Sequence, residues 1–355
     1  MSRGDRLRLA FMALHPDRGR ALLERHGTAA NVLRLAERGK LDRIDAGRVL
    51  DLEECESAMD RAGCRAIVRG DADYPEVLGD LGDPPEVLFV RGNLPQAPGV
   101  AVIGTRRCTA YGRRLASRFG AAIAAAGWPL VSGLARGIDG AAHRGTIEAG
   151  GIGVVVLGSG SDVIYPRDHR DVHDALLATG GAAISEYPPG TTPNGWRFPP
   201  RNRIISGLSA AVVVVEAAVT GGALITATRA GEQGRVLFAV PGDVDRPASV
   251  GCNLLIRDGA VPVLGPEDLI EALSLVLGPP SAPPVRSMAA SPDGVDGDVL
   301  QAADRSASPD DIAARLGIPI HEVLAAIGRL EIGGHAVVRG GFLEPPGGGS
   351  RVAER

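Results

Sequence analysis

The sequence predicts an α/β fold, with a parallel sheet that is covered on both faces and lies between a small helical domain and a winged-helix domain. Four short runs of mainly β-branched residues carry this prediction, at 99–103, 154–157, 212–215 and 237–240. Each run is too short for a buried helix and is bounded by Gly or Pro, as is typical of central parallel strands. Helical segments alternate with these runs, which indicates repeated β-α units.

The chain divides into five predicted segments, which are a helical domain of the SAM or helix-hairpin-helix kind (1–64), a sheet domain (65–277), a linker (278–297), a winged-helix domain (298–345) and a disordered tail (346–355). In the first segment Pro16 opens a helix that ends near His26, and Gly27-Thr28 caps the next. Helix pairs joined by such a glycine turn occur in nucleic-acid-binding modules. A small bundle without a ligand of its own fits the same pattern.

The sheet domain opens with two strands that flank a short helix, between residues 65 and 91. Its later helices are predicted at 110–126, 139–149, 167–178, 202–208, 223–233, 252–258 and 266–277. Pro166 and Pro266 each stand at the start of a helix, where the missing N–H has no cost. The segment from Glu186 to Pro200 is predicted to be a long loop.

The winged-helix prediction depends on three helices and a hairpin. The helices are predicted at 298–305, from Pro309 to Leu316, and from Pro319 to about Ile332, and the hairpin at 336–344 has a Gly-Gly turn. The third helix offers only Arg329 as a fixed positive charge. Because a recognition helix normally carries several basic or amide side chains, we favour a protein-contact or stabilising role over base reading.

Composition excludes several classes of protein. The net charge is −4, so binding of a polyanion requires a local basic patch. Lys40 is the only lysine, which excludes P-loop NTPases, kinases and Schiff-base enzymes from the sheet domain. The four scattered cysteines indicate reduced buried thiols in a cytosolic protein rather than disulfides or a metal site. The uncharged stretch 119–135 contains Gly127 and Pro129 and is predicted to be a helix end plus a strand, not a membrane span.

Two glycine-containing turns follow predicted strands, at the edge where open α/β sheets bind ligands. The turn 104–107 offers backbone N–H groups, a hydroxyl and the guanidiniums of Arg106 and Arg107, which match phosphate oxygens. In the turn 132–139, two glycines allow the backbone to approach a ligand closely. Asp139 is placed to cap the following helix, and we expect it to hydrogen-bond to His143.

Further polar turns follow later strands. Residues 158–163 begin like a dinucleotide fingerprint but have Val163 in place of the third glycine, which excludes a nicotinamide site. The segment 198–203 places Arg201, Asn202 and Arg203 beside Phe198, which favours single-stranded nucleic acid if Phe198 is exposed and not part of the core. Glu216 is either catalytic, as in a nucleotide hydrolase, or holds Arg203 or Thr226 in place.

Taken in order, these turns resemble the DprA/Smf family of DNA-processing proteins over roughly 65–265. The resemblance rests on the motifs at 104–107, 132–139 with His143, 157–167, 185–190, 201–205, 223–227, 239–242 and 253–260. It implies an extended Rossmann-like domain that binds single-stranded DNA, forms a homodimer, protects DNA during natural transformation and helps to load the RecA recombinase. By position it implies phosphate contact by Arg106, added charge from Arg167 and Arg201, and a backbone groove at Gly133, Gly137 and Gly160. The chain departs from the family pattern at Thr105, Pro200 and Gly221.

The prediction is therefore a non-enzymatic, cytoplasmic protein that binds single-stranded DNA with little sequence preference and needs no cofactor or metal. The predicted DNA-binding residues are Gly104, Thr105, Arg106, Arg107, Ser132, Gly133, Arg136, Gly137, Gly158, Ser159, Gly160, Arg167, Phe198, Arg201, Asn202 and Arg203. The main alternative is a nucleotide phosphoribohydrolase that uses Glu216, although residues 220–223 lack the Pro-Gly-Gly-x-Gly-Thr run of those enzymes. A second alternative is a scaffold that binds only proteins, through its winged module.

Overall fold

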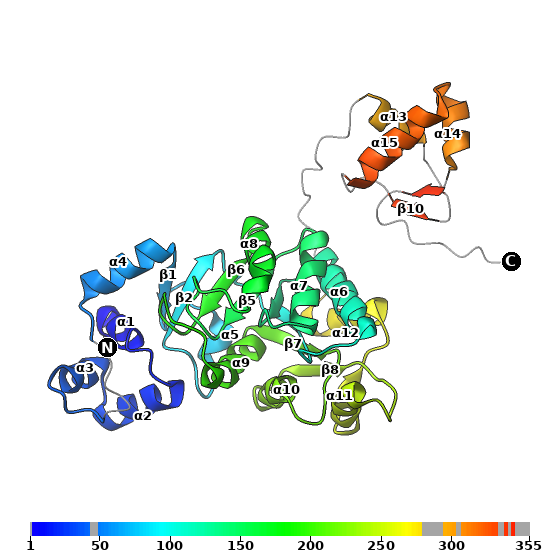
Figure 1. Cartoon of the computed structure of the whole chain (residues 1–355). Coiled ribbons are helices and arrows are strands. Elements are labelled where there is room, and N and C mark those ends of the chain that lie inside the picture. Colours follow the sequence, from blue (N-terminus) through cyan, green and yellow to red (C-terminus); the bar gives the residue numbers. More distant parts are fainter. Residues whose placement is uncertain are drawn as a thin grey trace. The chain divides into compact units, whose positions relative to one another are not determined.

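The structure is a computed structural model that describes residues 2–42, 49–278, 294–302, 307–332, 337–339 and 342–344. The chain divides into two units, Met1–Pro284 and Val285–Arg355, which are described separately (Figure 1). Within the described ranges, no helix is long and apolar enough to cross a membrane.

A nine-stranded sheet with the order β1-β2-β6-β5-β4-β3-β7-β8-β9 forms the centre of the first unit. The strands are β1 (Arg65–Val68), β2 (Val87–Gly92), β3 (Gly99–Ile103), β4 (Leu130–Ser132), β5 (Gly153–Leu157), β6 (Ala182–Ser185), β7 (Ser209–Val214), β8 (Val236–Ala239) and β9 (Val261–Pro262). Strands from β6 to β9 across the sheet pair in parallel, whereas β2 pairs antiparallel with both β1 and β6. The predicted parallel sheet is confirmed. β6 and β9 were not among the predicted strands.

Helices cover both faces of this sheet (Figure 1). They are α5 (Glu76–Gly79), α6 (Ala110–Ala125), α7 (Ile138–Glu148), α8 (Arg170–Ala178), α9 (Phe198–Gly207), α10 (Gly222–Glu232), α11 (Pro247–Arg257) and α12 (Pro266–Leu277), with short 3-10 turns η1 (Arg167–His169) and η2 (Gly195–Arg197). Two predicted starts are wrong, since α9 begins four residues before 202 and α11 five residues before 252. Both helices carry proline in their first turn, which accepts a residue without an N–H.

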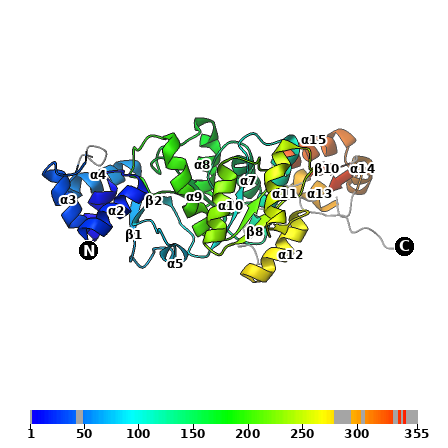
Figure 2. The same cartoon turned by 90° about the horizontal axis from the view of Figure 1, so that it is seen from below.

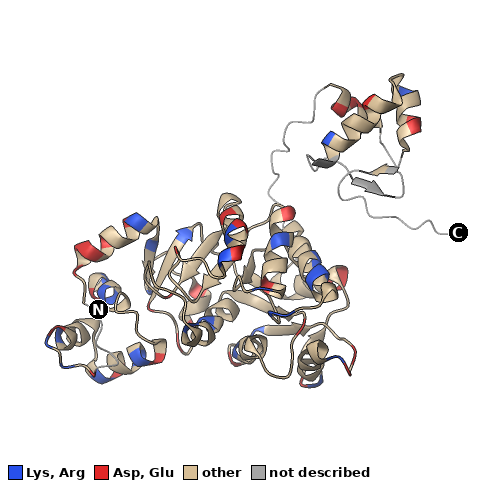
Figure 3. Cartoon of the chain, viewed as in Figure 1, with Lys and Arg blue, Asp and Glu red and all other residues tan. Residues whose placement is uncertain are grey.

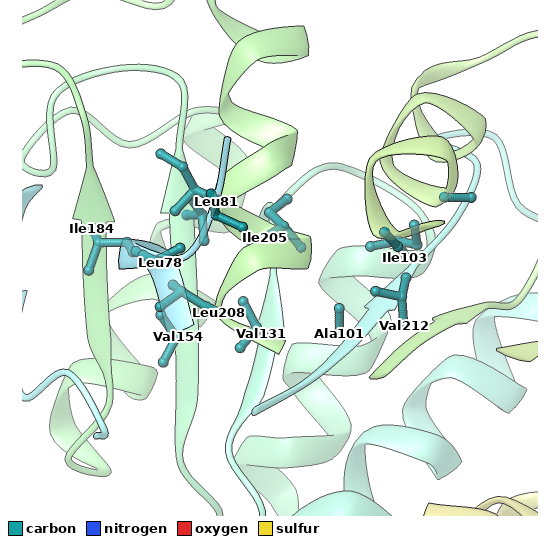
Figure 4. Packing of buried hydrophobic residues seen from close by; sticks show 14 of the residues in the cluster. Leu78, Leu81, Ala101, Ile103, Val131, Val154, Ile184, Ile205, Leu208 and Val212 are labelled. Carbon is teal, nitrogen blue, oxygen red and sulfur yellow. The ribbon is translucent and has the colours of Figure 1, made fainter. Parts of the chain in front are cut away.

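Successive side chains of a strand point to opposite faces of the sheet, and in the central strands the side chains on both faces are apolar and buried. Val100 and Val102 pack with α6, α7 and α12 on one face, while Ala101 and Ile103 pack with α9, α10 and α11 on the other. Figure 4 shows the second face, where Ile205 of α9 lies over the sheet with Val131, Val154 and Val212. The β-branched runs are therefore central strands, as predicted.

The N-terminal segment consists of α1 (Arg3–Ala10), α2 (Pro16–His26), α3 (Ala29–Glu37) and α4 (Leu52–Ala62). Leu7 of α1 and Cys55 of α4 pack with Phe89 against the β1–β2 edge, whereas Leu9 belongs to a separate cluster with α2 and α3. Figure 2 shows these helices beside β1 and β2, at the end of the sheet. The Thr28 side chain accepts from the N–H of Asn31 and caps α3, as predicted. The domain boundary at 64 stays a prediction.

The second unit has the three helices and hairpin expected of a winged helix, namely α13 (Val295–Ala302), α14 (Pro309–Leu316), α15 (Ile320–Ile332), β10 (Val337–Arg339) and β11 (Phe342–Glu344). Its core contains Val299, Ile312, Val323 and Leu343. α13 begins inside the predicted linker, so that boundary is wrong by three residues. The hairpin turn at 340–341, residues 303–306, most of the linker and the 346–355 tail lie outside the described residues.

Arg329 of α15 pairs with Asp296 of α13 at 2.6 Å, so this arginine holds two helices together.

All four cysteines are free thiols. Cys55 and Cys252 are buried as predicted, and burial raises the pKa of Cys55 to about 11 and that of Cys252 to about 12, so both remain protonated at neutral pH. Cys64 and Cys108 are half-buried. In the part of the chain that is described, no group of His, Cys, Asp and Glu could hold a metal ion.

Candidate nucleic-acid interface

The carboxyl ends of β3 and β7 border a cleft of about 710 Å³. The chain runs from β3 towards β4, β5 and β6 on one side, and from β7 towards β8 and β9 on the other, so this is the switch point at which open α/β sheets bind ligands. A neighbouring hollow of about 240 Å³ shares part of the lining. The shared residues, which define the arginine cleft, are Arg106, Arg107, Ala135, Tyr165, Phe198 and Arg201.

The turn after β3 presents two exposed arginines to this cleft. The Thr105 N–H donates to the Glu216 carbonyl oxygen at 2.8 Å, and the Thr105 hydroxyl accepts from the Arg107 N–H at 3.2 Å. These bonds fix the turn against the end of β7. Neither Arg106 nor Arg107 has a carboxylate partner within the described residues. Figure 3 shows further basic positions along α6, the helix that follows this turn.

Phe198 and Tyr165 form an aromatic wall of the cleft. The two ring centroids are 5.5 Å apart, and the Arg106 guanidinium carbon lies 5.4 Å from the Phe198 centroid. Phe198 is half-buried because one side packs on Gly158, where an added Cβ would lie 2.8 Å from the ring. Tyr165 is 42 % exposed. Phe198 is therefore a cleft residue and not part of the core.

Arg201, predicted to add positive charge for DNA, lines the cleft from below and is buried. It is 5 % exposed and donates to the carbonyl oxygens of Gly133, at 3.0 Å, and Val156. Burial lowers the pKa of Arg201 to about 10, so the guanidinium remains charged at neutral pH. It joins the ends of β4 and β5 from below.

Asp139 is the buried counter-charge of Arg201. It accepts from the N–H of Gly133 at 3.1 Å and that of Ala135 at 3.4 Å, so it holds the turn 133–135. The predicted helix cap is wrong, because Gly137 is the N-cap of α7 and no side chain caps it. Burial raises the pKa of Asp139, and the nearby Arg201 charge opposes this rise. The predicted Asp139–His143 hydrogen bond is absent, and burial lowers the pKa of His143 to about 3, which keeps that ring neutral.

Arg203 is also internal, contrary to the prediction. Its guanidinium donates to both carboxylate oxygens of Glu186, at 2.8 and 2.9 Å, and lies 3.2 Å from a carboxylate oxygen of Asp83. Asn202 lines the cleft floor, and its amide is 3.4 Å from the Gly222 carbonyl oxygen. The predicted basic pair around Asn202 is therefore a support beneath the cleft and not a pair of exposed cations.

Four further predicted residues are buried under the surface. The Ser132 hydroxyl donates to the Val102 carbonyl oxygen at 2.7 Å, and the Ser159 hydroxyl donates to the Val163 carbonyl oxygen at 2.6 Å. Gly158 lies under Phe198, and Gly160 packs against the 188–190 backbone. These four residues were predicted to bind DNA, Gly160 as part of a backbone groove, but neither hollow includes them.

Comparison with known proteins identifies the family of the chain. The family model of DNA recombination-mediator protein A matches residues 65–274, and that of the DprA winged helix domain matches 279–341. The chain belongs to the DprA/Smf family. It is 41 % identical to Protein Smf of Escherichia coli strain K12 over 280 residues, which is 76 % of this chain and 74 % of that protein. It is also 41 % identical to DNA processing protein DprA of Bacillus subtilis over 220 residues, 61 % of this chain and 74 % of that protein.

Solved structures of family members have the same fold. The X-ray structure of DprA from Streptococcus pneumoniae matches with a TM-score of 0.62 and 31 % identity, over 76 % of this chain and 98 % of that one. DNA processing protein A from Helicobacter pylori, described for its unique single-stranded DNA binding mode, matches with a TM-score of 0.52 and 25 % identity, over 60 % of this chain and 97 % of that one. The extended Rossmann-like sheet with a winged helix is therefore the DprA fold.

Two other predicted arginines of this DprA/Smf protein lie near the cleft. Arg136 lines the smaller hollow and pairs with Asp168 at 3.0 Å, with both side chains largely exposed. Arg167 is exposed at the start of η1, next to the lining residue Pro166, and does not itself line either hollow. Arg106 and Arg107 are exposed and line both hollows, whereas Arg201 lines both hollows from a buried position.

Glu216 stabilises the start of α6. Its carboxylate accepts from the Thr109 N–H at 2.8 Å and from the Thr109 hydroxyl at 2.5 Å, and the side chain is buried. It therefore holds neither Arg203 nor Thr226. The two bonds to Thr109 give Glu216 a structural role that the sequence did not indicate.

The 194–198 segment contains aromatic contacts that the sequence analysis missed. The Arg197 guanidinium carbon lies 4.7 Å from the Trp196 ring centroid and 5.1 Å from that of Tyr187, and Trp196 is 38 % exposed. Tyr165 was likewise not among the predicted residues. One signal in the sequence could have indicated these contacts. Aromatic residues make up only 3 % of the chain, and several of them are next to an arginine.

Gly137 allows the turn 132–139 to pack against the turn 104–107. Its φ is +84°, and an added Cβ would lie 2.3 Å from the Thr105 carbonyl oxygen. Gly137→Ala is expected to lower the free energy of unfolding by more than the about 1–2 kcal/mol of left-handed strain alone. Gly180→Ala is the matched control, since Gly180 has φ +89° and open space around it. Urea denaturation of both variants measures the difference, and equal losses would contradict the close approach.

Proposed function

We propose that the arginine cleft binds single-stranded DNA, largely without sequence preference, and that the protein acts by binding and not as an enzyme. The observation that carries this proposal is the unpaired Arg106 guanidinium over Phe198, at a sheet switch point. Guanidiniums neutralise phosphates, and aromatic faces stack on any base, so the pair fits an unpaired strand. The described binding mode of the Helicobacter pylori relative supports the same ligand.

The proposal divides the predicted residues into two groups. The turn 104–107, Phe198, Arg136 and Arg167 would contact the strand, together with Tyr165. The buried Arg201, Asn202 and Arg203 would hold these groups in position without touching DNA. Gly133 and Gly137 would allow the loops to pack closely beneath the strand.

A titration of labelled oligothymidine at about 50 and 200 mM salt tests the proposal. We expect the logarithm of the affinity to fall with the logarithm of the salt concentration, by about 0.7 per phosphate contacted. A random oligonucleotide of equal length should compete equally, and duplex DNA poorly. Equal competition by duplex DNA, or release of free base from nucleoside monophosphates, would contradict the proposal.

We further propose that the DNA-bound form acts as a homodimer and loads the RecA recombinase, in the cytoplasm, during DNA processing and natural transformation. The family description as a recombination mediator supports the RecA partner. Support for a second copy comes from exposed apolar side chains on and after β9 and on α12. Val261, Leu264 and Leu275 are 43 %, 78 % and 89 % exposed, and a partner would cover such side chains.

A further inference from the structure

A second cavity, of about 400 Å³, lies between the N-terminal helices and the antiparallel edge of the sheet. Its walls come from α1, the 11–15 connection, α2, the segment 82–87, and residues 186–187. It shares no lining residue with the arginine cleft. Its volume is within the range of small-molecule sites, about 300–1,000 Å³.

The body of this cavity is apolar. Leu9 and Ala10 of α1, Leu14 of the connection, Leu23 of α2 and Val87 of β2 line it. They come from two separate core clusters, one within the helical segment and one against the sheet. The cavity therefore lies where the two clusters meet without filling the space between them, and it offers apolar surface to a ligand.

The charged groups of the lining are paired with one another. Glu86 lies 3.6 Å from Arg6 and 3.4 Å from Arg69. Arg203 is held by Glu186 and Asp83, as described above, and the same carboxylates line the cavity. Because each of these cations faces a carboxylate, the site has no free positive charge for an anion, in contrast to the arginine cleft.

Buried polar atoms in the lining lack hydrogen bonds. The Tyr187 hydroxyl has no partner within the described residues, although the residue is 2 % exposed. The Arg6 Nε and a carboxylate oxygen of Glu86 are also buried, but they face one another at 3.6 Å as an ion pair. A buried hydroxyl without a partner is costly, so the Tyr187 hydroxyl indicates a ligand with one group that hydrogen-bonds to it.

We propose that this cavity binds a neutral small molecule with an apolar body and one hydroxyl or amide group, at a site separate from the DNA-binding surface. The apolar body packs on the leucines of α1 and α2. The polar group bonds to the Tyr187 hydroxyl. Nucleic acid and other anions are excluded by the paired charges of the wall.

Gly19 provides a clean way to fill the cavity. It lies in the interior of α2, lines the cavity and has nothing within 4 Å of an added Cβ. A larger side chain there projects into open space without displacing a neighbour, and any other ordinary residue has a higher helix propensity than glycine. Gly19→Trp and Gly19→Leu are the filling variants, and Gly19→Ala is the matched control.

The probe is 2-naphthol, a neutral bicyclic alcohol, with 2-naphthalenesulfonate as its anionic counterpart, both titrated calorimetrically into the full chain. We expect saturable 2-naphthol binding that Gly19→Ala retains, and that both filling variants weaken by at least about tenfold while their far-ultraviolet circular dichroism is unchanged. Tyr187→Phe should weaken it about fivefold, the effect of one hydrogen bond. Absent 2-naphthol binding, unchanged affinity in both filling variants or in Tyr187→Phe, or tighter binding of the sulfonate would each overturn the proposal.

Discussion

Replacing Arg106 with alanine is expected to weaken the binding of oligothymidine by about 5- to 150-fold, which corresponds to about 1–3 kcal/mol for a charge-assisted phosphate contact. The reason is that Arg106 has no carboxylate partner among the described residues and lies over the Phe198 ring, so its charge is free for a phosphate. The loss of one phosphate contact should also reduce the slope of affinity against salt by about 0.7. Fluorescence anisotropy at several salt concentrations measures both quantities.

Arg118→Ala is the matched control for this prediction. Arg118 is an exposed arginine of α6, 4.0 Å from Glu267 and outside both hollows, so its removal changes the net charge equally. We expect its affinity and salt slope to stay close to those of the unchanged protein. Equal losses in the two variants would mean that overall charge, and not the arginine cleft, determines binding.

Arg201→Met is expected to destabilise the fold by about 3–5 kcal/mol at neutral pH, because it leaves a buried charge without its partner. The uncompensated group is Asp139, which is 6 % exposed and accepts hydrogen bonds from the N–H groups of Gly133 and Ala135. Urea denaturation at pH 7 gives the free energy of unfolding. A change of less than about 1 kcal/mol would show that Asp139 does not depend on Arg201.

The loss of stability in Arg201→Met should depend on pH in a definite direction. Burial raises the pKa of Asp139 in the folded protein above its unfolded value, and removal of the opposing Arg201 charge raises it further. A carboxyl group whose pKa is higher in the folded than in the unfolded protein stabilises the folded state at pH values below its unfolded pKa. This stabilisation is lost as the pH rises through the pKa of the folded state. The deficit of Arg201→Met should therefore be largest near neutral pH and shrink as the pH falls towards about 4.

Combining Arg201→Met with Asp139→Asn separates support from DNA contact. Removing both charges should recover most of the lost stability, since a buried pair replaced as a whole costs little. If Arg201 only supports the cleft from below, the double variant should bind oligothymidine nearly as well as the unchanged protein. Weak binding by a stable double variant would instead assign Arg201 to the DNA surface.

The strands and the ligand-binding edge could be predicted from the sequence because their signals are local. Runs such as Val212–Val215 are apolar and β-branched, and only a sheet covered on both faces buries them completely. The turn with Arg106 and Arg107 follows such a run directly, so its place at the sheet edge follows from the strand itself. The family motifs then indicated which of the remaining loops belong to the same predicted DNA-binding surface.

Local sequence signals could not predict which polar side chains are buried. Arg201 and Arg203 read as exposed cations, but α9 begins at Phe198 and places both on its buried side. Their partners, Asp139, Glu186 and Asp83, are distant in sequence, so no local pattern reveals the compensation. Ser132 was misplaced for the same reason, since its hydroxyl bonds to the carbonyl oxygen of Val102, which is distant in sequence. The Ser159 hydroxyl instead bonds locally, to the carbonyl oxygen of Val163.

The attachment of the arginine turn to β7 has a consequence for the kinetics of DNA capture. Thr105 and Thr109, on either side of Arg106 and Arg107, are both bonded to Glu216, the first to its backbone and the second to its carboxylate. The segment is thus preorganised, and a strand that arrives need not order it. Association should then be limited by diffusion and long-range attraction rather than by a loop rearrangement, and observed rates should rise linearly with DNA concentration without a plateau.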